Sequence, residues 1–414
     1  MPERERVEEM TEVFEINIRH LRGLLAIHEH GSITAAGSLV NLSQPALTQG
    51  IAKLERQFGY TLFERRSGGM IPTAMGRIVI ERTEAALKHL ADSAQGLTNV
   101  FNNPERLMTM TQLRAFLALA NAGSFAEAAR SIAISQTAVH RAVGDLELVI
   151  GTDLVERRGR AVWLNAAGKK LARGSRLAVA EIQAALVDLA LDSDSRSEMI
   201  SFGALPLARP YIVPRAMADI AKEVPKASFK VLEGSWSELV EPLRDGAIDM
   251  IVGALRPHEI ADLYQRPLLE DLLVVAAGSQ HPLASVERPT MDQLRSYPWI
   301  VAPADAPLRA HWERFFAEGP RPETQIECGS VMIIGRLLTY SNLLTLLSPD
   351  QVALQIRSGL LTQIGRPLEG SRRMVGITTR RSWRPTATQR LFFEKLEEAA
   401  RERISNPDLT GTWI

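Results

Sequence analysis

The segment SQPALTQGIAKLERQFGYTLFERR, residues 43–66, returns in altered form as SQTAVHRAVGDLELVIGTDLVERR, residues 135–158. The two segments lie 92 positions apart and align without a gap. The same register extends beyond them: Leu21-Arg22 matches Leu113-Arg114, Gly31-Ser32 matches Gly123-Ser124, and Gly76 matches Gly168. An ungapped match of this length predicts that the first half of the chain is a tandem duplication of one small unit.

Each copy has the pattern of short helices followed by a hairpin. Apolar residues recur at helical spacing, and serine, asparagine and glycine stand where helices begin, turn and end. In the first copy we expect helices from Arg19 to His28, Thr34 to Val40, Ser43 to Gly59 and Thr73 to about Leu97, with a wing in the segment TLFERRSGGMIPT. The second copy repeats this pattern from Gln112 to about Leu191, and its closing helix is expected from Asn165.

Short helices in this order are typical of a helix-turn-helix, whose second helix enters the major groove of DNA with its start nearest the bases. Glutamine, threonine and arginine can read base edges there, and wing arginines can contact the flanking phosphates. The predicted DNA contacts are Thr34, Ser43, Gln44, Pro45, Thr48, Gln49, Lys53, Arg65 and Arg66 in the first copy and Ser135, Gln136, Thr137, His140, Arg141, Arg157, Arg158 and Arg160 in the second. The alternative is that these are merely solvated helix faces. The combination of the helical pattern, the caps, the wing arginines and the duplication favours DNA binding.

Charge is neutral overall but uneven along the chain. The 414 residues contain 48 Lys and Arg and 48 Asp and Glu. Residues 18–77 hold seven basic and three acidic residues, and residues 110–169 hold seven and five. Because DNA senses the charge of the face that contacts it, a neutral chain is compatible with phosphate binding.

The first segment, with the TAMG that follows it, resembles the DNA-binding head of LysR-type transcriptional regulators, and the second resembles a weaker copy of it. The family usually has one head, so the doubling is a departure. Gly144 and Asp145 weaken the second copy as a phosphate-facing surface, which favours the first copy as the main base reader. The resemblance further implies that the helix after each wing pairs with that of another chain, giving a homodimer or homotetramer.

The second half of the chain predicts an open α/β domain, because short apolar runs alternate with helical segments. Strands are expected at Ile200–Ala204, Phe229–Leu232, Ile248–Val252, Leu272–Ala276, Trp299–Val301, Leu343–Leu347 and Met374–Thr378. Helices are expected near residues 210–222, 236–245, 307–317, 330–340, 349–357 and 386–403. Ligands bind beyond the carboxyl ends of the strands in such sheets.

This half is similar to the effector-binding domain of the same regulators, on the segments GALPLARPYIVP, LRDGAIDMIVG, GSQHPLAS, YPWI and LLSPDQVA. The resemblance implies a periplasmic-binding-protein-like fold of two lobes with the effector between them. The implied contacts are Leu205, Pro206, Leu207, Ser235, Ser330 and Thr345. The alternative for the two serines is that they only cap helices. The GALPLARPYIVP opening resembles the branch of the family that responds to sugars or sugar acids, which implies such an effector.

The expected fold class is therefore α + α/β: two winged helix-turn-helix domains followed by a two-lobed, periplasmic-binding-protein-like α/β domain. We expect an acidic tail at 1–15, the first head with its linker helix at 16–98, the second at 109–192, and the effector domain at 199–403 with an inner lobe at about 271–364.

Other chemistry is not supported. The trio His28-Glu29-His30 does not share one helix face, so no metal site is expected, and no catalytic motif or cofactor fingerprint occurs. The single cysteine, Cys328, favours a reducing compartment, and no leader or membrane span is expected, which together suggest the cytoplasm. We therefore expect a non-enzymatic regulator that binds double-stranded DNA and a small-molecule effector. The alternative is a small-molecule-binding protein whose N-terminal units mediate protein contacts.

Overall fold

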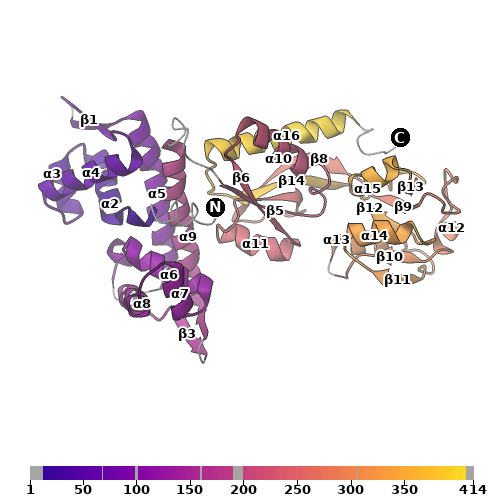
Figure 1. Ribbon diagram of the computed structural model, residues 1–414, viewed down its shortest axis with the longest axis horizontal. Coiled ribbons are helices and arrows are strands. Elements are labelled where there is room, and N and C mark those ends of the chain that lie inside the picture. The colour runs from indigo at the N-terminus through magenta and orange to yellow at the C-terminus, as the bar shows by residue number, and fades with distance from the viewer. Residues whose placement is uncertain are drawn as a thin grey trace. The chain divides into compact units, whose positions relative to one another are not determined.

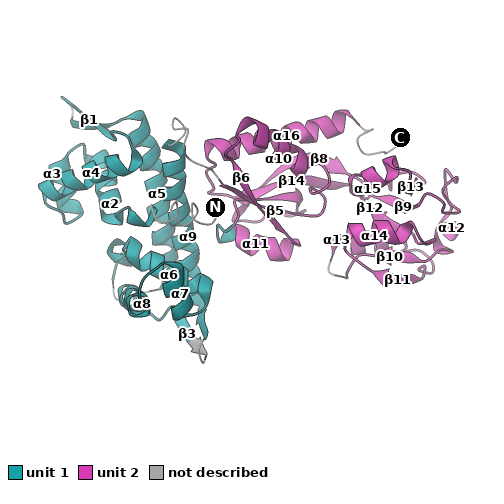
Figure 2. Cartoon of the chain, in the orientation of Figure 1, with its two compact units in different colours: residues 1–196, 244–247 teal, residues 197–243, 248–414 magenta. Residues whose placement is uncertain are grey.

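The computed structural model describes residues 13–67, 69–97, 101–158, 161–189, 199–304 and 306–406. Its chain forms two compact units, one of residues 1–196 with 244–247 and one of residues 197–243 with 248–414 (Figure 2). Most of the predicted acidic tail, residues 1–12, lies outside the described residues. Within the described part of the chain, no helix is both long enough and apolar enough to cross a membrane.

The first unit contains two copies of one fold (Figure 1). The first copy consists of α2 (Ile18–His30), α3 (Ile33–Leu39), α4 (Gln44–Phe58), β1 (Phe63–Arg66), β2 (Gly69–Pro72) and α5 (Ala74–Ala94). After the short helix η1 (Pro104–Leu107), the second consists of α6 (Met110–Ala122), α7 (Phe125–Ser131), α8 (Gln136–Ile150), β3 (Val155–Arg158), β4 (Ala161–Leu164) and α9 (Ala166–Leu189). Each element of the second copy begins 92 residues after its counterpart.

The duplication extends to individual hydrogen bonds. The Glu55 carboxylate accepts the backbone N–H of Leu62 at 2.8 Å, and Glu147 accepts that of Leu154 at 2.8 Å. Both bonds tie the end of a recognition helix to the start of its wing. One continuous apolar cluster, from Val13 to Leu189, forms the core beneath both copies.

The helices α5 and α9 pack against each other within one chain, side by side between the two copies (Figure 1). The Arg82 guanidinium donates to Glu181 at 2.9 Å and to Asp188 at 2.8 Å, and the Lys170 ammonium donates to the Gln95 carbonyl at 2.6 Å. Later residues of α5 thus meet earlier residues of α9, so the helices run antiparallel. The resemblance implied pairing between chains, whereas here the pair forms within a single chain.

The second unit begins with a mixed sheet of strand order β6-β5-β7-β14-β8. Its strands are β5 (Met199–Ala204), β6 (Ser228–Glu233), β7 (Met250–Ala254), β8 (Leu263–Asp271) and β14 (Arg373–Arg380), and its helices are α10 (Ile212–Glu223), α11 (Trp236–Arg244) and α16 (Ala387–Ser405). The strands β5, β6 and β7 are parallel, whereas β14 is antiparallel to both β7 and β8. Apolar side chains of this sheet, α10 and α16 form one core.

A second, smaller lobe lies between β8 and β14 in the chain. Its strands β9 (Val274–Gly278), β12 (Thr345–Leu347) and β13 (Leu361–Ile364) have the order β12-β9-β13, and β10 (Trp299–Val301) pairs with β11 (Thr324–Glu327). Its helices are α12 (Met291–Arg295), α13 (Pro307–Phe315), α14 (Val331–Leu338) and α15 (Pro349–Arg357). The predicted fold class, two winged helix-turn-helix copies followed by a two-lobed α/β domain, is confirmed.

Candidate nucleic-acid interface and sensor site

The start of α4 faces solvent. Ser43 is its N-cap, with the hydroxyl oxygen accepting the N–H of Ala46 at 3.3 Å. Gln44 and Pro45 form the exposed first turn, and proline is tolerated there because its missing N–H would have no partner within the helix. This end therefore offers polar side chains and the positive end of the helix dipole to a groove or a phosphate.

One face of α4 is buried and the opposite face is polar. Leu47, Ile51 and Leu54 belong to the core, whereas Thr48, Gln49 and Lys53 are exposed. The Thr48 hydroxyl donates to the Gln44 carbonyl at 2.8 Å, which leaves its methyl group and oxygen lone pairs for contact. Thr34, in the first turn of α3, is also exposed. The predicted readers of the first copy thus lie on accessible surface.

The wing of the first copy is the β1–β2 hairpin, in which Arg65 pairs with Met70 and Arg66 with Gly69. Both arginine side chains are exposed. Arg66 donates to the Glu64 carboxylate at 2.7 Å, an exposed pair that water and salt weaken. A phosphate could therefore compete with Glu64 for Arg66.

The counterpart of α4 in the second copy is α8, which begins with the same serine cap and exposed first turn but differs in the side chains that follow. Ser135 caps it by accepting the Ala138 N–H at 3.1 Å, and Gln136 and Thr137 are exposed. His140 is half-buried and stacks on Phe125 of α7, with ring centroids 3.6 Å apart. Its ring is therefore partly committed to packing within the copy.

Charge also differs between the two reading faces. The counterpart of Lys53 is Asp145, which lies 3.9 Å from the exposed Arg141. The Asp145 carboxylate beside Arg141 weakens the attraction of this arginine to phosphate. Arg157 and Arg158 lie in β3, and Arg160 lies outside the described residues. The stacking of His140 on Phe125 and the carboxylate of Asp145 beside Arg141 both favour the first copy as the stronger DNA contact.

Leu205, Pro206 and Leu207 follow the carboxyl end of β5, Ser235 and Ser330 lie at helix starts, and Thr345 is the first residue of β12. These predicted effector residues differ in exposure. Pro206 is exposed and Leu207 is half-buried, whereas Leu205 is buried against α11. Thr345 is buried in β12, and its hydroxyl donates to the Ile300 carbonyl at 3.0 Å. Leu205 and Thr345 therefore serve the core as the structure stands, and their contact with an effector stays a prediction.

The two predicted serines both lie at helix starts. Ser330 is the exposed N-cap of α14. Ser235, before α11, donates to the Glu238 carboxylate from its N–H at 2.7 Å and from its hydroxyl at 2.8 Å. The backbone hydrogen bond from Ser235 lowers the pKa of Glu238, so this carboxylate stays ionised. An anionic group of an effector would have to displace Glu238 from this helix start, whereas a neutral hydroxyl would not be repelled.

Two arginines lie near the carboxyl ends of β5, β6 and β7 but were not predicted from the sequence as effector contacts. Arg209 donates to the carbonyl oxygens of Ala204 and Gly234, which end β5 and follow β6. Arg256 follows β7, and its guanidinium carbon lies 4.7 Å from the ring centroid of Trp236. Burial lowers the pKa of Arg256, because its charge is desolvated. Neither arginine belongs to a pattern that could be recognised without knowing which strands are neighbours.

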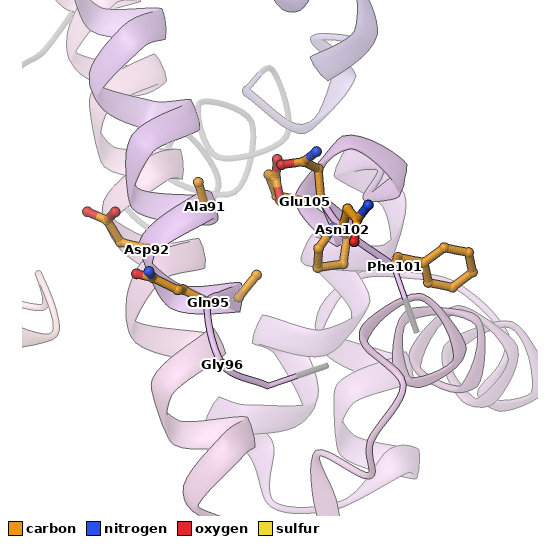
Figure 3. A pocket seen from close by; sticks show the side chains of 10 residues that line it. Ala91, Asp92, Gln95, Gly96, Phe101, Asn102 and Glu105 are labelled. Atoms are coloured by element: carbon orange, nitrogen blue, oxygen red, sulfur yellow. The ribbon is translucent and has the colours of Figure 1, made fainter. Parts of the chain in front are cut away.

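The first unit also has a pocket of about 410 Å³ (Figure 3). It lies where the end of α5 approaches η1, and it is lined by Ala91, Asp92, Ala94, Gln95, Gly96, Phe101, Asn102, Asn103, Pro104 and Glu105. None of the residues predicted to bind DNA or effector lines it.

Two family models match the chain. The helix-turn-helix model of the bacterial regulatory lysR family matches twice, at residues 18–77 and 110–169, and the LysR substrate binding domain matches residues 193–401. The HTH-type transcriptional regulator GalR of Pseudomonas putida is 29% identical over 367 residues, covering 88% of this chain and 92% of that protein. PcaQ of Agrobacterium fabrum is 26% identical over 293 residues, which cover 94% of that protein but 70% of this chain.

Solved structures show the same fold. Full-length OxyR of Pseudomonas aeruginosa, in a form carrying one cysteine-to-aspartate substitution, superposes with a TM-score of 0.55 and 22% identity, covering 71% of this chain and 95% of that one. LysG of Corynebacterium glutamicum, with its bound effector Arg, gives a TM-score of 0.54 and 19% identity, covering 71% and 99%.

Proposed function

Because this chain belongs to the LysR family of bacterial transcriptional regulators, we propose that the exposed starts of α4 and α8, with their wings, are the surfaces by which it binds double-stranded DNA. The chain is a DNA-binding transcription regulator controlled by a small-molecule effector, and its relatives are regulators rather than enzymes. We assign the heads to residues 16–98 and 109–192 and the effector domain to 199–403. We infer that the protein acts in the cytoplasm, where its DNA target would lie, and that it assembles as a homodimer or homotetramer.

The observation that supports this assignment most directly is the outward-facing first turn of α4. Ser43, Gln44 and Pro45 are exposed, whereas one face of the rest of the helix packs on the core. Arg65 and Arg66 then lie on the hairpin that follows the helix, where wing residues contact the backbone of DNA. The rival function, in which the helical units bind only protein, gives no reason for two wings carrying paired arginines.

Binding to promoter fragments, followed by fluorescence anisotropy over a series of salt concentrations, tests this proposal. Arg65→Ala with Arg66→Ala should weaken binding by about tenfold or more and reduce the slope of log K against log salt by about 2. Arg401→Ala, which removes an exposed arginine of α16, is the matched control. Unchanged binding by the wing variant would favour the rival function.

For the effector we propose a sugar acid rather than a neutral sugar. Arg256 follows the carboxyl end of β7, and a carboxylate is the natural partner of its guanidinium. Arg209 already pairs with the Glu233 carboxylate at 3.2 Å, so an effector carboxylate would have to compete with Glu233 for it. Glu238 already occupies the start of α11, so the hydroxyl groups of the effector would lie there and its acid group near an arginine.

Calorimetric titration with hexuronic acids and with the matching neutral hexoses tests this choice. Arg256→Met should weaken binding of the acid by about tenfold or more, and the protein should still fold. Arg372→Met removes an exposed arginine of the same domain and serves as the control. Tighter binding of the neutral sugar than of the acid would contradict the proposal.

A further inference from the structure

A buried cluster of three charges joins α5 to α9. The side chain of Arg82 is 7% exposed, that of Glu181 is 9% exposed and that of Asp188 is 10% exposed. The Arg82 guanidinium donates to Glu181 at 2.9 Å and to Asp188 at 2.8 and 3.2 Å. One cation is thus neutralised by two carboxylates in the interface between the helices. We call these three residues the ion triad.

The repeat shows that the ion triad exists at only one end of the helix pair. The residue 92 positions after Arg82 is Gly174, and the residues 92 positions before Glu181 and Asp188 are His89 and Gly96. At that second end none of these three positions carries a carboxylate or a guanidinium, and the helices approach closely: a Cβ on Gly174 would lie 2.2 Å from the Cβ of Ser93. The two ends of the α5–α9 pair therefore occupy equivalent positions of the repeat but carry different residues.

This asymmetry makes pairing between like helices unfavourable. Two α5 helices in the same register would place Arg82 against His89 and Gly96, which carry no carboxylate. Two α9 helices would place Glu181 and Asp188 against Gly174, which carries no cation. Both arrangements bury uncompensated charge, whereas the α5–α9 pair neutralises it.

We propose that the ion triad makes α5 pair with α9, and that a single chain thereby presents α4 and α8 together as a complete two-helix reader of DNA. Buried polar groups that fix the partner and register of paired helices are a known device in coiled coils. The connection between the copies is short, which gives the helix of the same chain a high effective concentration. The DNA consequence rests on the proposed function, but the pairing does not.

Cross-linking of exposed groups can test the pairing without DNA. Lys170 and Gln95 are exposed and adjacent across the α5–α9 pair, so Gln95→Glu creates a carboxylate that a carbodiimide can join to Lys170. The counterpart of Gln95 in α9 is Val187, so Val187→Glu places the equivalent carboxylate where it could reach Lys170 only in an α9–α9 pair. The full-length chain carrying both substitutions is prepared with ¹⁴N and with ¹⁵N, and the two preparations are mixed before cross-linking.

We expect peptides joined through Lys170 and residue 95, each with a single isotope, because the pair forms within one chain. Joined peptides of mixed isotope in a substantial fraction would show that the helices pair between chains and would overturn the single-chain reader. A predominance of peptides joined through residue 187 would overturn it equally. DNA binding does not enter either readout, so failure of the proposed function would leave these results unchanged.

A charge-free variant tests the role of the ion triad itself. Arg82→Met, Glu181→Met and Asp188→Leu together remove the charges and should raise the ratio of 187-linked to 95-linked peptides by about tenfold. The matched control removes the same types of charge from the exposed face of α5, as Glu84→Met, Lys88→Met and Asp92→Leu. An unchanged ratio in the charge-free variant would show that the ion triad does not select the partner. If this variant does not fold, Arg82→Gln with Glu181→Gln and Asp188→Asn tests the same point with nearly unchanged shape.

Discussion

Gly76 lies so close to Leu62 that a Cβ at position 76 would be 2.0 Å from the carbonyl oxygen of Leu62. The second copy repeats this contact, with 2.0 Å between a Cβ on Gly168 and the carbonyl oxygen of Leu154. Here the first turn of the long helix crosses the start of the wing. Real Cβ atoms do not approach backbone oxygen so closely, so no residue with a side chain fits without moving one of the two segments.

Substitution of either glycine should therefore destabilise its copy. Gly76→Ala and Gly168→Ala should each lower the free energy of unfolding by about 2 kcal/mol or more, through overpacking against backbone. Gly144→Ala is the matched control, because a Cβ on this glycine of α8 meets nothing within 4 Å. It should instead stabilise by about 0.5–1 kcal/mol through helix propensity. Urea unfolding of the full chain measures all three, and equal effects at positions 76 and 144 would contradict the prediction.

The tight turn before each recognition helix should respond to a single exchange. Asn41 and its counterpart Ala133 both have positive φ, 53° and 56°. Asparagine tolerates this conformation better than alanine. Ala133→Asn should therefore stabilise the second copy by about 0.5–1 kcal/mol, and Asn41→Ala should destabilise the first by a similar amount. Thermal unfolding checks the sign of each shift, and shifts of the same sign would contradict the strain argument.

The two recognition helices should contribute unequally to DNA affinity. Thr48→Ala with Gln49→Ala removes two exposed side chains, whereas His140→Ala with Arg141→Ala removes one ring stacked on Phe125 and one arginine beside Asp145. We expect the first variant to lose about 2–4 kcal/mol of specific binding and the second to lose less. Anisotropy titration on a footprinted promoter measures both losses. A greater loss from the second variant would make α8 the main reader.

In the sensor, Ser348 should be structurally important through one hydrogen bond. Its buried hydroxyl donates to the Asp271 carboxylate at 2.6 Å, at the place where β8 leads from the first lobe into the second. Ser348→Ala should lower the free energy of unfolding of this unit by about 1–3 kcal/mol, because a buried carboxylate oxygen loses its donor. Ser358→Ala, at an exposed site whose hydroxyl donates to the Gln355 carbonyl, should change it by less than about 0.5 kcal/mol. Equal changes in the free energy of unfolding for the two variants would contradict a special role for the buried Ser348–Asp271 hydrogen bond.

The stability of the sensor should decrease in mild acid. Burial lowers the pKa of His281 below its usual 6.5, and its Nδ1 accepts the Leu283 N–H at 3.1 Å. The unfolded chain therefore binds a proton near pH 6.5 before the folded one does, so stability is full above this pH and falls as pH drops through it. His281→Gln should flatten the dependence of the unfolding midpoint on pH, whereas His258→Gln, at an exposed site, should not. A midpoint that rises toward about pH 5 would contradict the assignment.

Local sequence patterns predicted the elements that are regular and internally consistent. The start of α4 at Ser43 and the strand β10 at Trp299–Val301 lie where periodicity and caps placed them. The strand β8 was missed, because LYQRPLLED contains a proline that is unfavourable inside a sheet. In the structure β8 is an edge strand, and Pro267 lies opposite Gly376 beside an irregularity in the pairing. Proline is acceptable at this position because β8 pairs with a strand on one side only, and the sequence of β8 alone does not reveal this.

Sites made by distant segments were harder to predict than sites made by one helix. The exposed polar faces of α4 and α8 were predictable because cap, periodicity and polar residues lie within one short segment. The ion triad was not, because Arg82 and Asp188 are separated by 106 positions and meet only through the packing of two helices. Arg256 was missed for the same reason, since its ring partner, Trp236, belongs to a different element.

The presence of both recognition helices in one polypeptide has a consequence for how the protein can change. In an assembly of identical single-head subunits, a codon change in the recognition helix appears in every head at once, so both halves of the target must adapt together. Here α4 and α8 are encoded separately and have already diverged at positions such as Thr48 and His140. One head can therefore acquire a new preference while the other retains the old one, so such a gene can explore new regulatory sites in single mutational steps.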